Sequence, residues 1–412
     1  MKIAIIGSGI SGLGAAWLLN AKHEITVYEK DARIGGHSNT VEASGIPVDT
    51  GFIVYNARNY PHLVGLFKTL GVAVEESNMS FGVSLDGGKL EYAGTSLNTV
   101  FAQRKNLVNP RFLNMLKDIV RFNKQAAALL KTDRELTLGA YLDELKMGEW
   151  FRYRYLLPMA GAIWSCPLET MLAYPAQSFL RFFENHGLLT VADQPQWYTV
   201  KGGSREYVRK LSAPFADRIR LNTAAHCIIR EVDGVMVEDA RGEKEFYDHV
   251  VMAAHADQIL PMLKDADGNE KRVLSAFRYQ PNRAVLHRDA SLMPQSRRVW
   301  SSWNYLASGD LKNQPQVSLT YWMNRLQNID EANPLFVTLN PPREPDKILY
   351  ECQYAHPVFD QGTRAAQMQL PKIQGQRRTW FCGAWTRYGF HEDGLMSAVG
   401  VANALGVTAP WQ

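Results

Sequence analysis

The pattern of apolar and polar positions at the start of the chain predicts a strand, a tight turn, a helix and a second strand. Residues 1–6 form a mostly apolar run, and residues 10–16 are apolar or small. A second apolar run over 24–28 ends in Glu29. The glycines between the first strand and the helix are Gly7, Gly9 and Gly12. A short apolar strand that leads through glycines into a helix is typical of a βαβ unit in a parallel sheet.

This G-x-G-x-x-G turn predicts dinucleotide binding, against the alternative of a glycine-rich turn in an unrelated α/β protein. Gly7 allows the tight turn, Gly9 lets backbone N–H groups approach a pyrophosphate, and Gly12 lets the helix pack on the strand. The positive end of the helix dipole, near Ser11, faces the phosphates. Glu29 is placed to accept a hydrogen bond from a ribose 2′-hydroxyl and would repel the 2′-phosphate of NADP.

Later apolar runs predict further elements. Residues 249–256 and 379–383 are expected to add strands beside the first two, and 394–405 is expected to form a helix rich in small residues. Alternating apolar positions predict strands at 317–322 and 348–354, in a different, strand-rich region. No second G-x-G-x-x-G follows a strand, so a separate NAD(P)H domain is not expected.

These elements predict a discontinuous dinucleotide-binding domain. We assign it to residues 1–74, 196–264 and 373–412. Two inserts, the helix-rich 75–195 and the strand-rich 265–372, are expected to form one substrate domain together.

Composition narrows the class of protein. The chain has 412 residues, 46% of them hydrophobic and 21% charged, which is ordinary for a globular protein of two or three domains. A formal charge of +4 argues against a nucleic-acid partner. The cysteines form no C-x-x-C pair, which argues against a metal site and a disulfide framework and fits a reducing cytoplasm. They are Cys166, Cys227, Cys352 and Cys382. No apolar run approaches the roughly 18 residues of a membrane span.

One stretch, from Arg104 to Lys131, is strongly basic. Its basic residues are Arg104, Lys105, Arg111, Lys117, Arg121, Lys124 and Lys131, and its only acid is Asp118. Apolar residues recur among them at spacings of three and four, which predicts an amphipathic helix. Such a helix either packs on the core as an ordinary domain helix or lies on an anionic membrane surface. The second alternative would place the protein at the inner face of the membrane.

The residues after Glu29 carry a resemblance to a known family. The run Arg33-Ile34-Gly35-Gly36-His37-Ser38 and the C-terminal strand and helix resemble the flavin-containing amine oxidoreductases. That family includes monoamine oxidases, protoporphyrinogen oxidase, carotenoid desaturases and UDP-galactopyranose mutase. The resemblance implies an α/β fold with a Rossmann-like FAD-binding domain of the glutathione reductase type and an inserted α+β substrate domain. It also implies a non-covalently bound FAD.

The resemblance implies which residues surround this FAD. The expected cofactor-binding residues are Gly7, Gly9, Ser11, Gly12, Glu29, Lys30, Arg33, Gly35, Gly36, His37, Ser38, Gly383, Gly394, Leu395 and Met396. The C-terminal helix would direct its N-terminus at the flavin and stabilise negative charge on the reduced ring. The chain departs from the family twice, because Gly383 is followed by Ala384 rather than an acid, and because His37 stands where monoamine oxidases carry arginine. His37 and Cys382 are conceivable points of covalent attachment.

The substrate side is expected to be aromatic and apolar. Trp300, Trp303, Tyr321 and Trp322 are candidate pocket residues, against the alternative that they pack the core of a sheet. No metal site is expected. The His287–Asp289 pair shares one side of a strand but makes no metal site by itself.

The catalytic base is not identified by the sequence. Candidates beside the flavin are His391, Tyr388 and Arg387, in the loop before the C-terminal helix. The alternative for His391 is a loop histidine that faces solvent.

Several phrases, such as Asp49-Thr50-Gly51-Phe52 and Tyr388-Gly389-Phe390-His391, resemble a bacterial subgroup of the family. That resemblance implies an association with cyclopropane-fatty-acid-synthase-like enzymes and oxidation or desaturation of methyl-branched acyl lipids. The expected partner is therefore an apolar or acyl-lipid substrate. Three alternatives stay open: an amine oxidase, a redox-neutral sugar-nucleotide mutase, and a non-catalytic FAD-binding partner of a lipid-modifying enzyme. The sequence does not indicate an oligomeric state.

Overall fold

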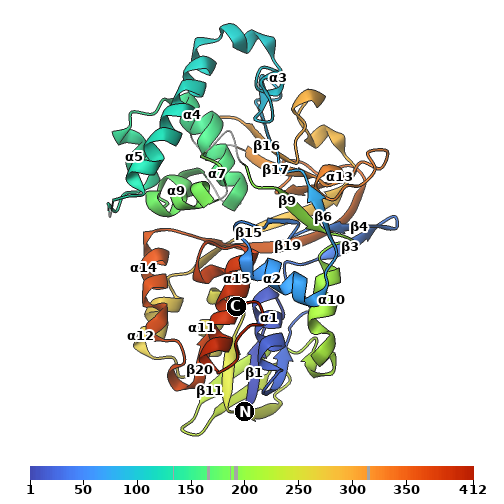
Figure 1. Cartoon of the computed structure of the whole chain (residues 1–412), viewed down its shortest axis with the longest axis vertical. Helices are drawn as coiled ribbons and strands as arrows, with labels where there is room; N and C mark the ends of the chain where they lie inside the picture. The colour runs from blue at the N-terminus through green and yellow to red at the C-terminus, as the bar shows by residue number, and fades with distance from the viewer. Residues whose placement is uncertain (133, 165–167, 186, 190–193, 313–315) are drawn as a thin grey trace.

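The computed structural model describes residues 1–132, 134–164, 168–185, 187–189, 194–312 and 316–412. Two domains are stacked along the long axis of the molecule, and both chain termini lie in the same one (Figure 1). We call these the parallel-sheet domain and the insert domain. Cys166 lies outside the described residues.

A five-stranded parallel sheet forms the centre of the first domain. Its strand order is β10 (Ile219–Arg220), β2 (Glu24–Tyr28), β1 (Lys2–Ile6), β14 (His249–Met252) and β20 (Thr379–Phe381). The three segments assigned to this domain from the sequence thus supply neighbouring strands. Ile3 and Ile5 face one side of the sheet, and Ala4 and Ile6 face the other, because side chains alternate along a strand.

Each face of this sheet is covered by a different layer. On one face lie α1 (Ile10–Leu19), α2 (Pro61–Leu70), α10 (Arg205–Ser212) and α15 (His391–Ala404). On the other lie the antiparallel strands β11 (Ala225–Arg230), β12 (Val235–Asp239) and β13 (Lys244–Tyr247), with α11 (Ala256–Met262) and α12 (Gly268–Leu274). This three-layer arrangement confirms the fold class predicted from the sequence.

Small residues let α1 and α15 pack closely. A Cβ added to Gly14 would lie 2.7 Å from Leu395 Cδ1, and one added to Gly394 would lie 2.7 Å from Ser11 Oγ. The last helix begins at His391, earlier than the Gly394 start expected from the sequence. His391 is therefore the first residue of the helix rather than a loop residue before it.

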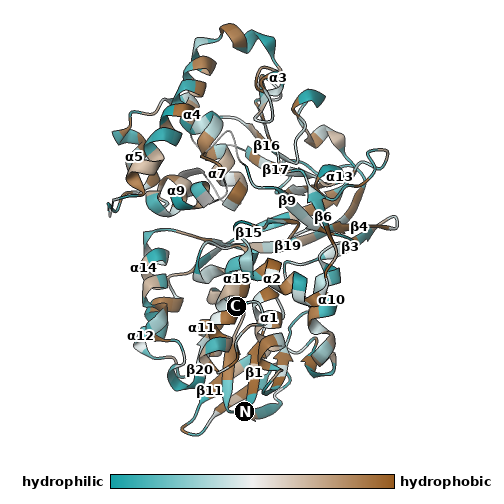
Figure 2. Ribbon diagram, viewed as in Figure 1, coloured by the Kyte–Doolittle hydropathy of each residue, from teal (hydrophilic) through white to brown (hydrophobic). Residues whose placement is uncertain are grey.

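The insert domain is built on a seven-stranded sheet. Its order is β19 (Ile348–Val358), β15 (Arg278–His287), β18 (Phe336–Leu339), β17 (Gln316–Trp322), β16 (Trp303–Ser308), β7 (Phe81–Leu85) and β8 (Leu90–Ala93). Because β7 and β8 come from the first insert, both inserts share one sheet. The helices α4 (Pro110–Leu129), α5 (Leu138–Glu144), α7 (Leu157–Trp164) and α9 (Ala176–Asn185) gather on one side of it and form one apolar core with it (Figures 1 and 2).

A buried carboxylate joins the two domains. Asp49 ends β4 (Ile46–Asp49) and accepts hydrogen bonds from the backbone N–H of Ser204 at 2.9 Å and from Gln327 Nε2 at 3.0 Å. Gln327 Oε1 in turn accepts the Asp49 N–H at 2.9 Å. Since Gln327 follows β17 of the insert domain, this reciprocal pair holds the domains together.

Among the described residues, no helix has both the length and the hydropathy needed to cross a membrane.

Candidate functional site

The candidate site lies where the parallel strands end. β1 leads into Gly7, β2 into Glu29, β14 into the segment 253–255, and β20 into Gly383 within two residues. Ligands of open α/β sheets bind outside the carboxyl ends of the strands. The insert domain covers this edge through β15 and β19 (Figure 1).

The glycine turn leaves space for a ligand above its backbone. Gly7 has φ of +108°, and a Cβ on Gly12 would lie 1.9 Å from the Gly7 carbonyl oxygen, so neither position tolerates a side chain. A Cβ on Gly9 would meet nothing within 4 Å. The nearest atom to a Cβ on Gly36 is the Gly9 Cα, at 3.1 Å. Gly9 and Gly36 thus face each other across a strip of bare backbone, which fits a pyrophosphate.

The N-terminus of α1 is available to an anion. Gly9 is the N-cap, no side chain caps the helix, and its first turn, which contains Ser11, holds no acid. The first N–H groups of a helix need partners, and its dipole favours a negative charge there.

Glu29 organises the turn in addition to its expected contact with ribose. Its Oε2 accepts the Ser8 N–H at 3.0 Å, and its Oε1 accepts the Asp31 N–H at 2.9 Å. A carboxylate oxygen can accept a further hydrogen bond, so Oε1 retains capacity for a ribose hydroxyl. The neighbouring Lys30 is exposed and pairs with Asp31 at 3.1 Å. Arg33 is also exposed and donates to the Gly36 carbonyl at 2.8 Å.

Two loops are paired beside the turn. The N–H of Phe52 donates to the His37 carbonyl at 2.8 Å, and the N–H of Thr50 donates to that of Asn39 at 2.9 Å. A Cβ on Gly51 would lie 2.2 Å from the His37 carbonyl oxygen, so glycine is required for this approach. Gly35 accepts the Ser38 N–H at 2.9 Å and completes the first loop.

Two further histidines, His255 and His356, lie around His37. Its ring lies 5.8 Å from that of His255, 5.6 Å from that of His356, and stacks on Tyr354 at 4.8 Å. Burial, followed by the neighbouring histidines, lowers the pKa of His37 well below its usual value, and burial lowers that of His356 to about 4. His255 Nδ1 is buried without a partner among the described residues, which a bound group would supply. These rings are therefore neutral at physiological pH.

No group of three His, Cys, Asp or Glu side chains suited to a metal ion occurs in the described part of the chain.

His391 faces inward rather than toward solvent. Its ring stacks on Phe52 with 3.9 Å between centroids, and its Nε2 lies 2.7 Å from the Tyr207 hydroxyl and 3.2 Å from Ser38 Oγ. Ser38 and Tyr207 also bond each other. Burial lowers the pKa of His391 to about 3, so the ring is a neutral hydrogen-bonding group. Phe52 and Tyr207 were not predicted as its partners, because both are remote from it in the sequence.

The other two catalytic candidates lie further from this network. Arg387 is exposed, donates to Met396 Sδ at 2.8 Å and stacks over the Tyr388 ring at 5.5 Å. Leu395, by contrast, is fully buried against α1. Arg387 and Tyr388 contact each other, Met396 and Asp393, whereas His391 contacts Phe52 and Tyr207. These contacts do not join the three candidates in one cluster.

The acids that open α15 are used for capping. Asp393 Oδ2 accepts the Phe390 N–H at 2.9 Å, and Glu392 accepts the N–H groups of His62 and Leu63 at the start of α2. Burial raises the pKa of Asp393 to about 6 and that of Glu392 to about 7. Neither acid replaces the family's acid beside Gly383.

The four pocket candidates divide between the two faces of the insert sheet. Trp303 and Tyr321 are cross-strand partners whose rings meet edge-on at 5.1 Å, on the face that carries the helices. Trp300 and Trp322 pack together in a separate small cluster on the other face, with Arg297 over both rings. Trp300 and Trp322 therefore do not share a pocket with the other pair, because successive side chains of β17 point to opposite faces.

A polar cluster of hydroxyls lies on the helix-bearing face near His37. Asn39 Nδ2 donates to the hydroxyl oxygens of Thr50, Tyr350 and Tyr354 at 2.9, 3.2 and 3.1 Å. Burial raises the pKa of the neighbouring Cys352 thiol, which keeps it protonated. This cluster supplies neutral hydrogen-bonding groups and no fixed charge.

His287 and Asp289 have structural roles. His287 is fully buried and its Nε2 lies 2.7 Å from Thr338 Oγ1. Asp289 pairs with Arg343 at 2.7 Å.

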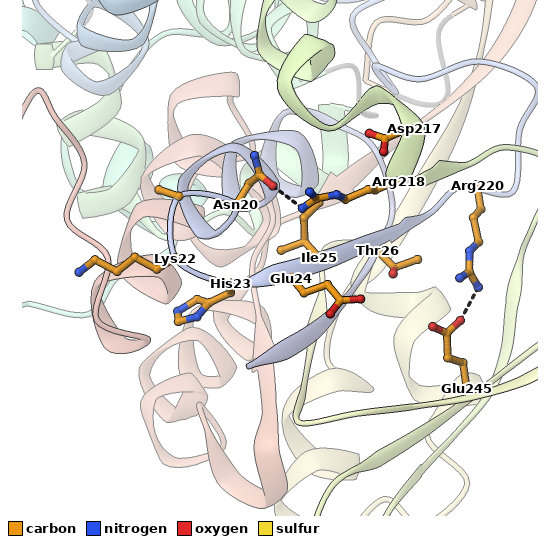
Figure 3. Close-up of a pocket in the computed structure, with 11 residues that line it drawn as sticks. Asn20, Lys22, His23, Glu24, Ile25, Thr26, Asp217, Arg218, Arg220 and Glu245 are labelled. Atoms are coloured by element: carbon orange, nitrogen blue, oxygen red, sulfur yellow. Dashed lines mark hydrogen bonds and ion pairs between the residues drawn. The ribbon is translucent and has the colours of Figure 1, made fainter.

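A hollow of ≈ 690 Å³ lies away from this chemistry. Figure 3 shows it at the amino end of β2, between Glu24 and the segment 217–220. Within it, Glu245 pairs with Arg220 at 2.6 Å, and Arg218 donates to Asn20 Oδ1 at 2.7 Å. Because it opens at the wrong edge of the sheet, it is not the dinucleotide site.

A second cavity, ≈ 290 Å³, adjoins the loop after β20. It is lined by Arg387 and Tyr388 together with Tyr174, Phe359 and Arg364, among others. Apolar rings and two arginines share this cavity.

Comparison with known proteins connects this geometry to a family. Residues 10–285 match the model of the flavin containing amine oxidoreductases. A Mycobacterium tuberculosis protein assigned as a flavin-containing monoamine oxidase, AofH, is 26% identical over 264 residues, which are 60% of this chain and 55% of that protein. The match thus spans just over half of the relative. A Staphylococcus aureus 4,4′-diapophytoene desaturase is 42% identical over 52 residues, 12% of this chain and 10% of the desaturase.

A solved structure extends the similarity to nearly the whole chain. The crystal structure of a CLA-producing fatty acid isomerase from P. acnes superimposes with a TM-score of 0.71 and covers 98% of both chains. The sequences are 15% identical, so this likeness concerns the fold.

Proposed function

The chain belongs to the flavin-containing amine oxidoreductase family, and we propose that it is a flavin-dependent oxidoreductase that binds FAD non-covalently and dehydrogenates an apolar, acyl-lipid-type substrate. The flavin would accept a hydride from a C–H bond held against it. A proton would be lost from the substrate to water at the same time, and O₂ or another acceptor would take up the two electrons. The protein's part is to bind, orient and exclude water.

The residues described above fit FAD. The bare strip of Gly9 and Gly36 and the uncapped N-terminus of α1 suit its pyrophosphate, and Glu29 suits the adenosine ribose. The first turn of α15, which begins at His391 and contains Gly394, would direct the helix dipole toward the flavin ring.

Non-covalent attachment is supported by the state of Cys382. This thiol is fully buried in the core beneath α15, and burial raises its pKa to about 12. A buried, protonated thiol is unreactive. Acid precipitation of the protein should release all the flavin into the supernatant.

The observation that supports an apolar substrate is the lack of charge where the loops meet the insert domain. His37, His356 and His391 are neutral because burial lowers their pKa values. The adjoining carboxylates Asp49 and Asp393 accept hydrogen bonds from the protein itself. Aromatic rings and hydroxyls remain, which suit a long apolar substrate with few polar contacts.

The polar contacts available to such a substrate are few. Trp303 Nε1 and the Tyr305 hydroxyl are buried on the helix-bearing face of the insert sheet and have no partner among the described residues. Arg364 and Arg387, in the smaller cavity, could hold an anionic head group. This combination fits an acyl lipid better than a sugar diphosphate, which needs several cations around its phosphates.

The test is anaerobic flavin absorbance of the purified, FAD-loaded protein mixed separately with bacterial phospholipid, a panel of amines, and NADPH. Bleaching by phospholipid alone is expected. Bleaching by amines would assign the protein as an amine oxidase instead. If no mixture bleaches the flavin, and dithionite-reduced protein isomerises a sugar nucleotide, the mutase alternative replaces the proposal.

A further inference from the structure

The basic segment that precedes and forms α4 has one apolar face that is buried in the fold and a second, exposed face on which apolar and basic residues are mixed. The buried face contains Phe112, Met115 and Phe122, which pack in the insert-domain core. A second stripe, Leu113, Lys117, Val120 and Lys124, follows at spacings of four, three and four on the opposite side of the helix. All four side chains of this stripe are exposed.

The exposed apolar residues continue into the preceding turn and helix. Leu107 and Val108 end the 3₁₀ helix Arg104–Val108, and their exposed fractions are 50% and 83%. Val120 is 68% exposed. Leu97, in α3 (Leu97–Val100), is 78% exposed. Large aliphatic side chains this exposed in one continuous segment lose the free energy of burial unless something covers them.

The charges around these residues are nearly all positive. Asp118, the only acid between Arg104 and Lys131, is paired with Arg121 at 2.9 Å. Among the described residues no ion pair engages the other basic side chains of the segment. These are Arg104, Lys105, Arg111, Lys117, Lys124 and Lys131.

We propose that this segment, defined by Leu97, Leu107, Val108, Leu113, Lys117, Val120 and Lys124 and called here the basic apolar surface, docks the protein onto an anionic phospholipid membrane. Aliphatic side chains enter the acyl boundary while the lysine and arginine heads stay at the phosphate level. The surface lies at the end of the insert domain farthest from the N-terminus (Figure 1), where hydrophobic and hydrophilic residues alternate (Figure 2). A membrane fits better than an acidic protein, because the lysines are spread between apolar residues rather than grouped at a rim.

Vesicle binding tests this surface without any turnover, so its result is independent of the proposed reaction. Full-length, FAD-loaded protein is sedimented with vesicles of phosphatidylcholine alone and of phosphatidylcholine mixed equally with phosphatidylglycerol. Binding to the anionic vesicles is expected, with loss at high salt because salt screens exposed charges. Equal binding to both vesicles, or to neither, would overturn the proposal.

Two independent double variants test the two components. Lys117→Glu with Lys124→Glu should weaken partitioning onto anionic vesicles by at least about tenfold, since each cation near the surface contributes on the order of fivefold. Val108→Asp with Val120→Asp should weaken it by a similar factor through the apolar component.

Matched controls come from the other domain. Val232 is 99% exposed but stands between Glu231 and Asp233, so Val232→Asp should leave binding unchanged. Lys271→Glu, an exposed lysine of α12, should likewise have no effect beyond the small change in net charge. An unchanged flavin spectrum verifies that each variant is folded. A loss of binding in the controls as large as in the double variants would refute this location. If the protein bound no vesicles but bound a soluble acidic protein, that protein would replace the membrane as the proposed partner.

Discussion

At the scale of single residues, one carboxylate combines structural and binding roles. Glu29 accepts N–H groups from both sides of the glycine turn, from Ser8 and from Asp31. The sequence predicted only its contact with ribose. Its role in ordering the turn involves backbone donors, whose direction a sequence motif does not specify.

Glu29→Gln should therefore weaken FAD binding by roughly 10- to 100-fold. The amide places an N–H₂ group or a neutral oxygen where charge-assisted hydrogen bonds form, and each such bond contributes about 1.5–3 kcal/mol. The measurement is the dissociation constant of FAD from quenching of flavin fluorescence on titration into apoprotein. The control is Glu24→Gln, an exposed glutamate at the start of the same strand. Equal affinities for the two variants would contradict this role.

Sequence spacing is most informative about contacts between residues that are close in the chain. A side chain on Gly12 would clash with the Gly7 backbone, five positions earlier in the chain. The spacing of the two glycines is therefore enough to predict this close approach. The partners of His391 are Phe52 and Tyr207, and only the folded chain brings these together. For the same reason, the presence of aromatic residues in the sequence could not show that Tyr321 and Trp322 lie on opposite faces of the sheet. The register of the strand decides which face each residue occupies.

At the scale of elements, the turn between β1 and α1 depends on the absence of a single methyl group. A Cβ on Gly12 would lie 1.9 Å from a backbone oxygen, which no side-chain rotation can relieve. Gly400, on the exposed side of α15, has no atom within 4 Å of an added Cβ. Substitution at Gly12 therefore tests the steric requirement for glycine, whereas substitution at Gly400 tests helix propensity alone.

Gly12→Ala is expected to abolish flavin binding, because the turn must open and the N-terminus of α1 is displaced from the pyrophosphate. Gly400→Ala should keep full binding and stabilise the protein by about 0.5–1 kcal/mol, because alanine favours the helix over glycine. Flavin content after purification and the thermal melting temperature of both variants are the measurements. Retention of stoichiometric flavin by Gly12→Ala would show that the turn is not the cofactor cradle.

Element boundaries were predicted best where one pattern dominates. The strand at 24–28 was placed correctly, since it is a single apolar run with an acid at its end. The start of α15 was expected at Gly394 but lies at His391, because Asp393 accepts the Phe390 N–H and extends the helix by its first turn. A small-residue run shows where a helix packs but not where its capping hydrogen bonds form.

At the scale of the whole molecule, the position of the insert domain over the sheet edge depends on the pair of Asp49 and Gln327. Burial raises the pKa of Asp49 to about 6, although Thr40, Ser204 and Gln327 all donate hydrogen bonds to its carboxylate. An acid whose pKa is higher in the folded state than in the unfolded chain binds more protons when folded. Its ionisation therefore lowers the free energy of unfolding as pH rises from about 4 to about 6.

Gln327→Glu places a second carboxylate against this group and should magnify that dependence. At pH 7.5 two buried like charges share one site, which should destabilise the protein by about 3 kcal/mol or expel one side chain and loosen the domains. At pH 5.5 the two carboxyls can share a proton, so most of the loss should be recovered. Melting temperatures at both pH values measure this. Gln316→Glu, at an exposed position at the start of β17 in the same domain, is the control and should show no such recovery. If Gln327→Glu were as stable as the control at pH 7.5, the two domains would have to be held together by contacts other than the pair of Asp49 and Gln327.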